Sequence, residues 1–528
     1  MSHIIRAINS LNFKIHLLII IFSQLTFFSI VNATPKQPNI IIILADDLGW
    51  ADVGYHGSDI NTPSIDRLTQ EGMRLERFYV NPICTPTRAS LLTGRDALKM
   101  GVGYFPILAW SNKAVSQSEI FLSETLKRSG YQTGMVGKWH LGHTLESHTP
   151  NANGFDDFFG HLHTQVFYYS HQTSGGHDLQ HNGQSVRRDG QYLTDVHGEQ
   201  AVRFIKNRDN AKPFFLYIPF LAPHSPMEAP KALIQSYNDR PPIAIPKNNP
   251  LHNTFPPSLV KQTQKIYAAM VDSMDQAIGR VLDTLDSEGI AKNTIVLFLS
   301  DNGGFYGFGA NNRPLRGEKM TVFEGGIRVP AVIRWAEQIP KQSVNHQVLS
   351  VMDIVPTLAN AINIDLSTSR PIDGINAWPL MQQPTFKNRD KDLFFVAEQP
   401  TASPFYYAVI RDEWKLIQVI QEDLYTKTVK NLLFNIHHDP NEQKNLAKKH
   451  PEKVAELSSS IADWAASHPV AGQRVEIAPN PGWLPPNDWA EVVIPNEQVQ
   501  ATSSAGFPPG TAKRLEQAYS GRASVIYK

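Results

Sequence analysis

The stretch Asn39-Ile40-Ile41-Ile42-Ile43-Leu44-Ala45-Asp46-Asp47 decides the class of fold. Its run 39–44 shows no apolar/polar alternation, which is typical of a strand covered on both faces of a sheet. Three other runs have the same character, namely 133–136, 214–218 and 294–299. Helical patterns separate these runs, and the longest covers 265–287. Strands that alternate with helices predict an α/β domain whose mainly parallel sheet is flanked by helices.

Polar side chains follow each of the four predicted strands. They are Asp46 and Asp47, Lys138 and His140, His224, and Asp301 and Asn302. Because ligands bind outside the carboxyl ends of the strands in open α/β sheets, these groups are expected to meet at one edge. The carboxylates and the amide form an all-oxygen set, which suits Ca²⁺ or Mg²⁺ rather than Zn²⁺. Read alone, an Asp-Asp pair is explained as well by turn and helix-cap chemistry.

A smaller unit is predicted after about residue 390. Short strand candidates at hairpin spacing occupy 393–397, 407–411 and 414–419, and a helix over 452–467 follows Pro451. We therefore predict a catalytic domain over 34–390 and a small α+β domain over 391–469. The Pro-rich extension 470–528 is interpreted as ordered coil or a lid.

The N-terminus predicts export. Arg6 and Lys14 precede an apolar run, and Val31-Asn32-Ala33 has the small residues of a cleavage site, so residues 1–33 are interpreted as a signal peptide. An uncleaved anchor is the alternative, and no other segment has the length and apolar character of a membrane span. A single cysteine, Cys84, excludes an internal disulfide. We expect a bacterial periplasmic or secreted protein.

The charge balance limits the classes of partner. Lys plus Arg and Asp plus Glu number 49 each in 528 residues, which argues against a protein that coats nucleic acid or an anionic membrane. Hydrophobic residues make up 41% and aromatic residues 10%, so a disordered chain is excluded.

Cys84 lies in the run Cys84-Thr85-Pro86-Thr87-Arg88. Pro86 and the threonines favour a helix that starts here, and the side chain at 84 would then lie at a helix N-terminus, which attracts anions. The alternative is a small cysteine buried in a core, but the neighbours of Cys84 are not core residues.

This run, followed by Leu92-Thr93-Gly94-Arg95, resembles the signature of the type I sulfatases. The resemblance extends from residue 38 to about 446, and it includes the segments 45–50, 62–66, 137–142, 300–304, 433–435 and 439–442. It implies an alkaline-phosphatase-like fold and a sulfuric ester hydrolase. In the family, the cysteine of this motif becomes formylglycine during export, so a formylglycine-generating enzyme is an implied partner.

The resemblance also implies a role for each residue. Hydrated formylglycine at position 84 would attack sulfur, and the sulfate would leave as the aldehyde re-forms. His140 would act as the base and His224 would serve the leaving oxygen. One Ca²⁺ would be held by Asp46, Asp47, modified Cys84, Asp301 and Asn302. The sulfate would be surrounded by Arg88, Lys138 and Lys319.

Within the family, the chain looks most like the arylsulfatase B group, N-acetylgalactosamine-4-sulfatases, on segments 50–58, 168–171 and 311–317. The implied substrate is a 4-O-sulfated galactose or N-acetylgalactosamine in a carrageenan- or chondroitin-type glycan. Eight histidines lie between 140 and 181, and they are interpreted as a polar loop of a sugar cleft rather than a second metal site. The candidate substrate contacts are Trp110, Tyr168, His171, Arg313 and Arg316.

Two other functions remain open. A phosphoester or phosphonate monoester hydrolase is one, because such enzymes share this fold and the C-x-P-x-R motif. A non-catalytic exported glycan-binding protein with an unconverted Cys84 is the other.

Overall fold

The computed structural model describes residues 37–496 except 105, 248, 250–251, 253, 255, 367–369, 383–388, 398–404, 423–425, 467–478 and 480–481. The predicted signal peptide and residues 497–528 therefore lie outside the described residues. The chain divides into two compact units, residues 1–37 and 38–528, and the description below is of the second.

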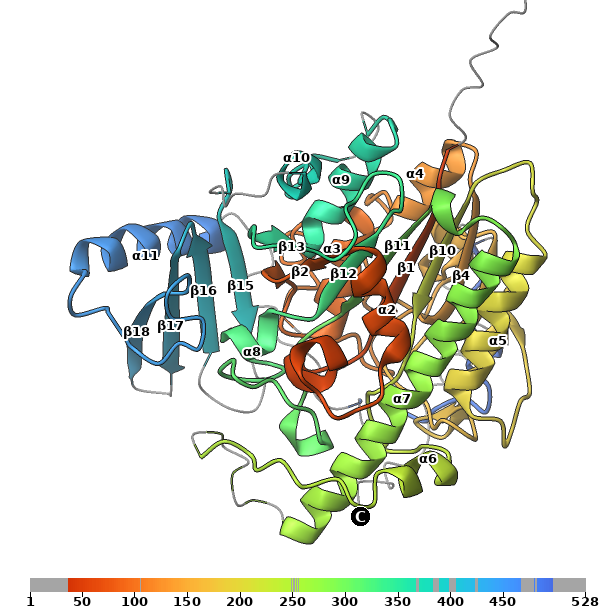
Figure 1. The fold of residues 1–528 in the computed structure, drawn as a ribbon, viewed down its shortest axis with the longest axis horizontal. Coiled ribbons are helices and arrows are strands. Elements are labelled where there is room, and N and C mark those ends of the chain that lie inside the picture. Colours follow the sequence, from red (N-terminus) through yellow and green to blue (C-terminus); the bar gives the residue numbers. More distant parts are fainter. Residues whose placement is uncertain are drawn as a thin grey trace, which may run out of the picture. The chain divides into compact units, whose positions relative to one another are not determined.

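A ten-stranded sheet lies at the centre of this unit, with helices on both faces (Figure 1). Strand β1 (Asn39–Ala45) pairs in parallel with β10 (Phe214–Pro219) on one side and β11 (Thr294–Ser300) on the other. Parallel pairing continues from β10 to β4 (Gln132–Lys138) and from β4 to β5 (Asp157–His161). The four predicted strands are thus adjacent, and the predicted α/β fold with a mainly parallel sheet is confirmed.

The outer strands are shorter and partly antiparallel. The full order is β13-β2-β12-β11-β1-β10-β4-β5-β8-β9. The remaining members are β2 (Met73–Leu75), β8 (Gln180–His181), β9 (Gln184–Ser185), β12 (Ala331–Arg334) and β13 (Ser343–Asn345). Two small two-stranded sheets pair β3 (Phe78–Tyr79) with β14 (Leu349–Ser350) and β6 (Gln172–Thr173) with β7 (Gly176–His177).

Successive side chains of β1 belong to two different cores. Ile41 and Ile43 lie in one cluster, and Ile40, Ile42 and Leu44 lie in the other. The first core is covered by α2 (Pro63–Glu71), α5 (Leu193–Lys206), α6 (Lys231–Ser236) and α7 (Pro257–Ser287). The second is covered by α3 (Cys84–Thr93), α4 (Leu122–Arg128), α9 (Ile354–Ala361) and α10 (Trp378–Met381). Burial on both faces explains why the strand lacks polar alternation.

A separate antiparallel sheet follows, with α11 (Pro451–Ala466) packed on one face (Figure 1). Its strands are β15 (Leu393–Ala397), β16 (Phe405–Arg411), β17 (Trp414–Glu422) and β18 (Lys427–Asn435). The small α+β unit is confirmed, whereas the exact domain boundaries stay a prediction. Strand β18 was not predicted, because its first half, Lys-Thr-Val-Lys, is exposed and only its second half is buried.

Helix boundaries differ from the prediction in two places. Helix α7 begins at Pro257, eight residues before the predicted start, because its exposed first turns carry too few apolar residues to show a helical period. The apolar pattern of the sequence also predicts a helix over 118–129, and the observed helix α4 begins at Leu122.

A buried group of three charged residues, here called the ion triad, links the small antiparallel sheet to helix α8 (Glu324–Ile327). Lys415 of β17 lies 2.9 Å from a carboxylate oxygen of Glu324, in α8, and 2.9 Å from one of Glu442. All three side chains are fully buried, and the hydroxyl of Tyr79 also donates to Glu324 at 2.9 Å. Because a buried charge is costly without its partners, the triad fixes how these elements meet.

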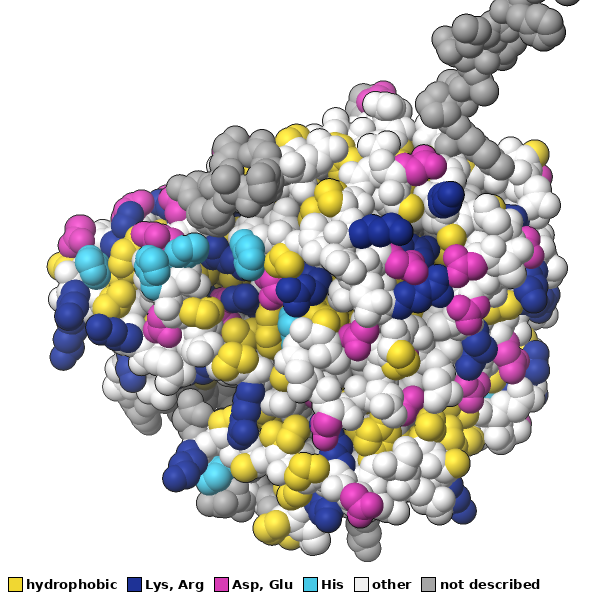
Figure 2. All heavy atoms as spheres, in the orientation of Figure 1, with side chains coloured by type: hydrophobic (Ala, Val, Ile, Leu, Met, Phe, Trp, Pro, Cys, Tyr) yellow, Lys and Arg dark blue, Asp and Glu magenta, His cyan; other side chains and the backbone are white. Residues whose placement is uncertain are grey.

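The surface carries charges of both signs. Figure 2 shows Lys/Arg and Asp/Glu side chains interspersed over the face shown, with several histidines gathered over the β15–β18 sheet and α11. Exposed His437 and His438 belong to this region. None of the helices within the described residues has the length and apolar character needed to cross a membrane.

Candidate active site

The ends of β1 and β11 bring the predicted acidic residues together. Asp301 follows β11, and its backbone amide donates to the carbonyl of Ala45. Its carboxylate accepts a hydrogen bond from the backbone amide of Asp47 at 3.2 Å. The amide group of Asn302 donates to Asp47 at 2.7 Å. Asp46, Asp301 and Asn302 are fully buried. The parallel register of the two strands therefore produces the predicted cluster.

Cys84 is the first residue of α3 and lies beside this cluster. Its side chain is 2% exposed, and Sγ lies 3.3 Å from Nδ1 of His140. The Nε2 atom of His140 lies 3.0 Å from the carbonyl of Ile107. Burial raises the pKa of the Cys84 thiol, against the charge of Lys138. An unmodified Cys84 is therefore a protonated thiol, and only the thiolate is a strong nucleophile.

Three cations surround the carboxylates. Arg88 of α3 donates to Asp301 at 2.8 Å and to the carbonyl of Lys138 at 2.9 Å. The ammonium of Lys138, at the end of β4, lies 2.5 Å from Asp46, and that of Lys319 lies 2.8 Å from Asp47. Lys319 comes from a loop that reaches back over β1, which explains why it carries no signal in the sequence beyond the family pattern.

The two predicted catalytic histidines are buried and electrically neutral at pH 7. Burial, and then the charge of Lys319, lowers the pKa of His224 to about 4. Burial and the charges of Lys138 and Arg88 hold the pKa of His140 well below its usual range. A neutral imidazole can accept a proton, which is what the role proposed for His140 requires.

Two of these residues have unusual backbone conformations. Asp47 and His140 have φ angles of 68° and 61°, in the left-handed region that non-glycine residues avoid. Such conformations cost roughly 1–3 kcal/mol each and concentrate at functional sites.

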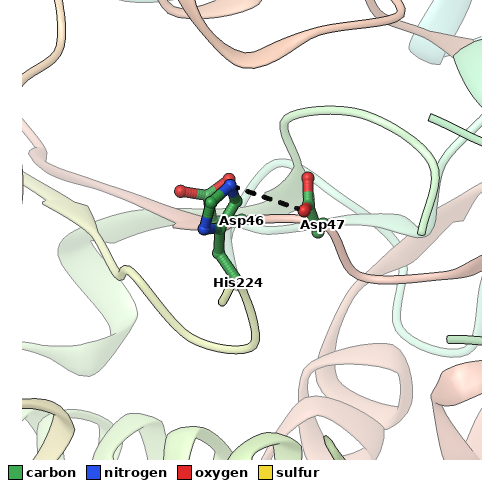
Figure 3. Close-up of side chains that lie close together, drawn as sticks. All are labelled: Asp46, Asp47 and His224. Atoms are coloured by element: carbon green, nitrogen blue, oxygen red, sulfur yellow. Dashed lines mark ion pairs between the residues drawn. The ribbon is translucent and has the colours of Figure 1, made fainter. Parts of the chain in front are cut away.

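The structure contains a group that can hold a metal ion. Asp46, Asp47 and His224 each offer a ligand atom, and these atoms lie within 4.8 Å of one another (Figure 3). In the described part of the chain, Oδ1 of Asp46 and Oδ1 of Asn302 are buried with no hydrogen-bond partner. Buried polar atoms are rarely left unpaired, so a cation fits here. Burial and the negative charge of nearby Asp46 raise the pKa of Asp301 to about 7. This raised pKa is a sign that the carboxylates of the site are close together.

The five predicted substrate contacts lie in different surroundings. Tyr168 is fully buried, and its hydroxyl donates to the carbonyl of His224 at 2.8 Å, so it supports the loop behind that histidine. His171 is also fully buried. Arg316 donates to the carbonyl of Glu442 and lies over the ring of Phe323.

The other two predicted contacts lie nearer the surface. Arg313 is exposed and donates to the carbonyl of Ala244. Trp110 is half-buried and contacts the ring of Trp483, at 6.0 Å between ring centroids. The nearness of Trp483 had no signal in the sequence.

A buried sheet edge that combines cations, carboxylates, the unpaired oxygens of Asp46 and Asn302 and a cysteine at a helix start defines an anion-processing hydrolase site. The sulfatase family pattern matches residues 38–364, and the pattern of the N-sulphoglucosamine sulphohydrolase C-terminal region matches 317–465. The chain therefore belongs to the sulfatase family, a family of sulfuric ester hydrolases.

Individual relatives agree with this assignment. The chain is 34% identical to arylsulfatase J of Mus musculus over 66% of its own length and 57% of the relative's. It is 32% identical to N-acetylgalactosamine-6-sulfatase of Homo sapiens, over 69% of its own length and 70% of the relative's. The crystal structure of Ps i-CgsB in complex with k-i-k-neocarrahexaose is similar with a TM-score of 0.72 and 30% identity, covering 84% of this chain and 96% of that one.

Proposed function

We propose that this protein hydrolyses a sulfate ester of a glycan at Cys84. The observation that carries the proposal is the position of Cys84. It lies at the start of α3, beside His140, and neighbouring elements supply cations, carboxylates and the unpaired oxygens of Asp46 and Asn302. The cations can bind a sulfate and stabilise the negative charge that develops on it during the reaction. His140 can accept a proton.

The cations bind and orient the sulfate in this proposal. Arg88, Lys138 and Lys319 come from three separate parts of the chain, namely α3, the end of β4 and a distant loop. Their positive charges are held in place by Asp46, Asp47 and Asp301 before any substrate arrives. Charges fixed in advance stabilise a transition state without the cost of reorganising the site.

His140 and His224 handle protons. His140 is proposed to take a proton from the group at position 84, to which its Nδ1 is already close. His224 is proposed to serve the leaving oxygen of the sugar once its Nε2, on the side of Asp47, is protonated, because the Nδ1–H of the neutral ring donates to the carbonyl of Ser225 at 2.6 Å and leaves only a lone pair at Nε2.

Two groups are proposed to complete the site. Formylglycine at position 84 supplies, when formed, a hydrated aldehyde with one hydroxyl for attack and a second for release. Ca²⁺ supplies positive charge, and Asp46, Asp47, Asp301 and Asn302 would hold it. His224 belongs to the same compact group of possible ligands, so it is a further candidate.

The proposed substrate is a sulfated galactose or N-acetylgalactosamine in a carrageenan- or chondroitin-type glycan. The similarity to Ps i-CgsB, whose complex contains a neocarrahexaose, supports the carrageenan type. We propose the 4-O-sulfate from the resemblance to the arylsulfatase B group. The 6-O-sulfate is the second candidate, because the chain is 32% identical to an N-acetylgalactosamine-6-sulfatase over 397 residues.

Export belongs to the same proposal. The charged and apolar pattern of residues 1–33 supports a signal peptide and a periplasmic or secreted location in a bacterium. A formylglycine-generating enzyme would act on Cys84 during this process.

The experiment that tests the proposal measures inorganic sulfate. The protein is co-expressed with a formylglycine-generating enzyme, and Cys84→Ala is the matched control. The substrates are carrageenan and chondroitin oligosaccharides sulfated at defined positions, an aryl sulfate and an aryl phosphate. Release from a 4-O-sulfated sugar, absent in the control, is the expected result, whereas release from 6-O-sulfated sugars alone would reassign the position.

Two other outcomes would contradict the proposal. Hydrolysis of the aryl phosphate alone would assign the protein to the phosphoester hydrolases. A free thiol at position 84 in protein from its native host, together with glycan binding and no turnover, would identify a non-catalytic glycan-binding protein.

A further inference from the structure

Residues 482–496, here called the return segment, lie against the loops that follow β4 and β5. The backbone amide of His177 donates to the carbonyl of Asn487 at 2.9 Å. The amide of Glu146 donates to the carbonyl of Ile494 at 2.8 Å, and the amide of Ile494 donates to the carbonyl of Thr144 at 2.9 Å. The return segment is therefore held by backbone hydrogen bonds at two points of the catalytic unit.

Side chains anchor the middle of the return segment. Asp488 is buried and accepts hydrogen bonds from Ser185 at 2.6 Å and Arg187 at 3.1 Å. Trp489 is 5% exposed, donates from Nε1 to the carbonyl of Thr173, and has its ring centroid 4.0 Å from that of His163. These contacts fix the position of the residues just before Asp488.

One of those residues is Trp483, whose ring contacts Trp110. The centroids are 6.0 Å apart and the planes meet at 75°, so the two rings form a corner. Trp483 also lies 6.3 Å from the buried ring of Trp489. Unlike Trp489, both Trp110 and Trp483 are only half-buried, so part of each ring reaches the surface.

A short chain of contacts links this aromatic corner to Cys84. Trp110 follows Ile107 by three residues, and the carbonyl of Ile107 contacts His140, which contacts Cys84. Three residues of chain span at most about 11 Å. His143, in the same loop as His140, is tied to the carbonyl of Ala109 at 3.2 Å.

We propose that Trp110 and Trp483 form a stacking subsite for a sugar ring next to the sulfated sugar at Cys84. This inference rests on the proposed function and adds to it a specificity residue from the return segment. Indole rings offer a rigid apolar face with a polar edge, which suits the apolar C–H face of a pyranose whose hydroxyls remain in water. Recognition would then come from segments more than 370 residues apart.

The test measures binding separately from turnover. In a Cys84→Ala background, isothermal titration calorimetry follows the affinity for k-i-k-neocarrahexaose and for a chondroitin sulfate hexasaccharide. Trp483→Ala and Trp110→Ala are each expected to weaken binding of the preferred hexasaccharide by roughly 10- to 30-fold. Trp483→Tyr keeps an aromatic ring and is expected to retain most of the affinity, which separates stacking from a local loss of folding.

Trp378 provides the matched control. It is half-buried and packs on another tryptophan, Trp335, at 5.5 Å, but it belongs to α10 on the second core. Trp378→Ala is expected to leave the affinity unchanged. In protein with Cys84 intact, the two subsite variants are expected to raise KM for the hexasaccharide much more than they change kcat.

The outcomes distinguish this inference from the proposed function. Unchanged hexasaccharide affinity in both tryptophan variants would overturn the subsite, and so would the absence of any binding to either hexasaccharide by protein with both tryptophans intact. If the hexasaccharide binds through the tryptophans while no sulfate is released from any substrate, the subsite stands and the proposed function fails.

Discussion

At the scale of single residues, the site is a set of charges that hold one another in place. Asp46 illustrates this balance. Burial favours the neutral acid, but the charges of Lys138 and Arg88 hold the pKa of Asp46 well below its usual range. Its Oδ2 faces Lys138 and Arg88, whereas its Oδ1 has no hydrogen-bond partner in the described chain. Asp46 thus has one oxygen that faces protein cations and one that is available to a ligand.

Lys319 gives the first test of this balance. Lys319→Ala removes a positive charge beside the proposed sulfate position, so kcat/KM for an aryl sulfate is expected to fall by about 10²–10³-fold. Steady-state sulfate release measures the change, and thermal denaturation checks the fold. Lys341→Ala, at an exposed lysine, is the control. Activity within threefold of the wild type would show that Lys319 has no role in the reaction.

Chelation tests the proposed cation. Removal of a bound Ca²⁺ by EDTA is expected to abolish sulfate release and to lower the melting temperature, because a ligand at about 100 times its Kd stabilises the folded state by about 2.7 kcal/mol. Readdition of Ca²⁺ is expected to restore both. Asn302→Ala removes one proposed ligand and is expected to reduce the response to EDTA. A melting temperature that changes with neither EDTA nor Ca²⁺ would exclude the proposed Ca²⁺ site.

At the scale of elements, strand packing positions the site residues. Gly137 precedes Lys138 in β4 and has a φ of 137°, and a Cβ there would lie 2.0 Å from the carbonyl oxygen of Pro219. The close approach of β4 and β10 therefore requires glycine. This contact sets how far Lys138 reaches toward Asp46.

Substitution of this glycine tests the contact. Gly137→Ala is expected to lower stability by more than about 1 kcal/mol and to reduce kcat, since the strand must move and Lys138 moves with it. Gly130→Ala is the matched control, because Gly130 also has a positive φ, of 88°, but a Cβ there meets nothing within 4 Å. Urea denaturation and sulfate release measure the two effects. Equal losses in both variants would mean that backbone conformation alone is responsible.

The buried ion triad tests how the small sheet is held. Lys415→Met leaves Glu324 and Glu442 buried without their cation, so a loss of about 3–5 kcal/mol is expected. Lys430→Met, at an exposed lysine of β18, is expected to change stability by less than about 0.5 kcal/mol. Urea denaturation compares the two variants. A similar small change in both would show that the triad contributes nothing to stability.

The same elements show what could be predicted from the sequence. The strands β1, β10 and β11 were predicted because burial on both faces leaves a continuous apolar run. Strand β18 was missed because its exposed half satisfies no burial pattern. The acidic cluster was predicted because parallel strands end at one edge, but the depth of Tyr168 and His171 depends on tertiary packing. No local pattern could place Trp483 beside Trp110, since backbone contacts of distant loops fix that pair.

At the scale of the whole molecule, the burial of Cys84 depends on parts of the chain that are synthesised much later. Arg88, on the same helix as Cys84, pairs with Asp301, and Asp301 leaves the ribosome more than 200 residues after Cys84. At synthesis rates of about 5–20 residues per second, that delay is on the order of 10–40 s. During this interval β11 is not yet inserted beside β1, so residue 84 remains accessible to another enzyme. If residue 84 is converted as proposed, its modification would compete with the closing of the sheet, and slower synthesis between residues 84 and 301 would favour the modifying enzyme.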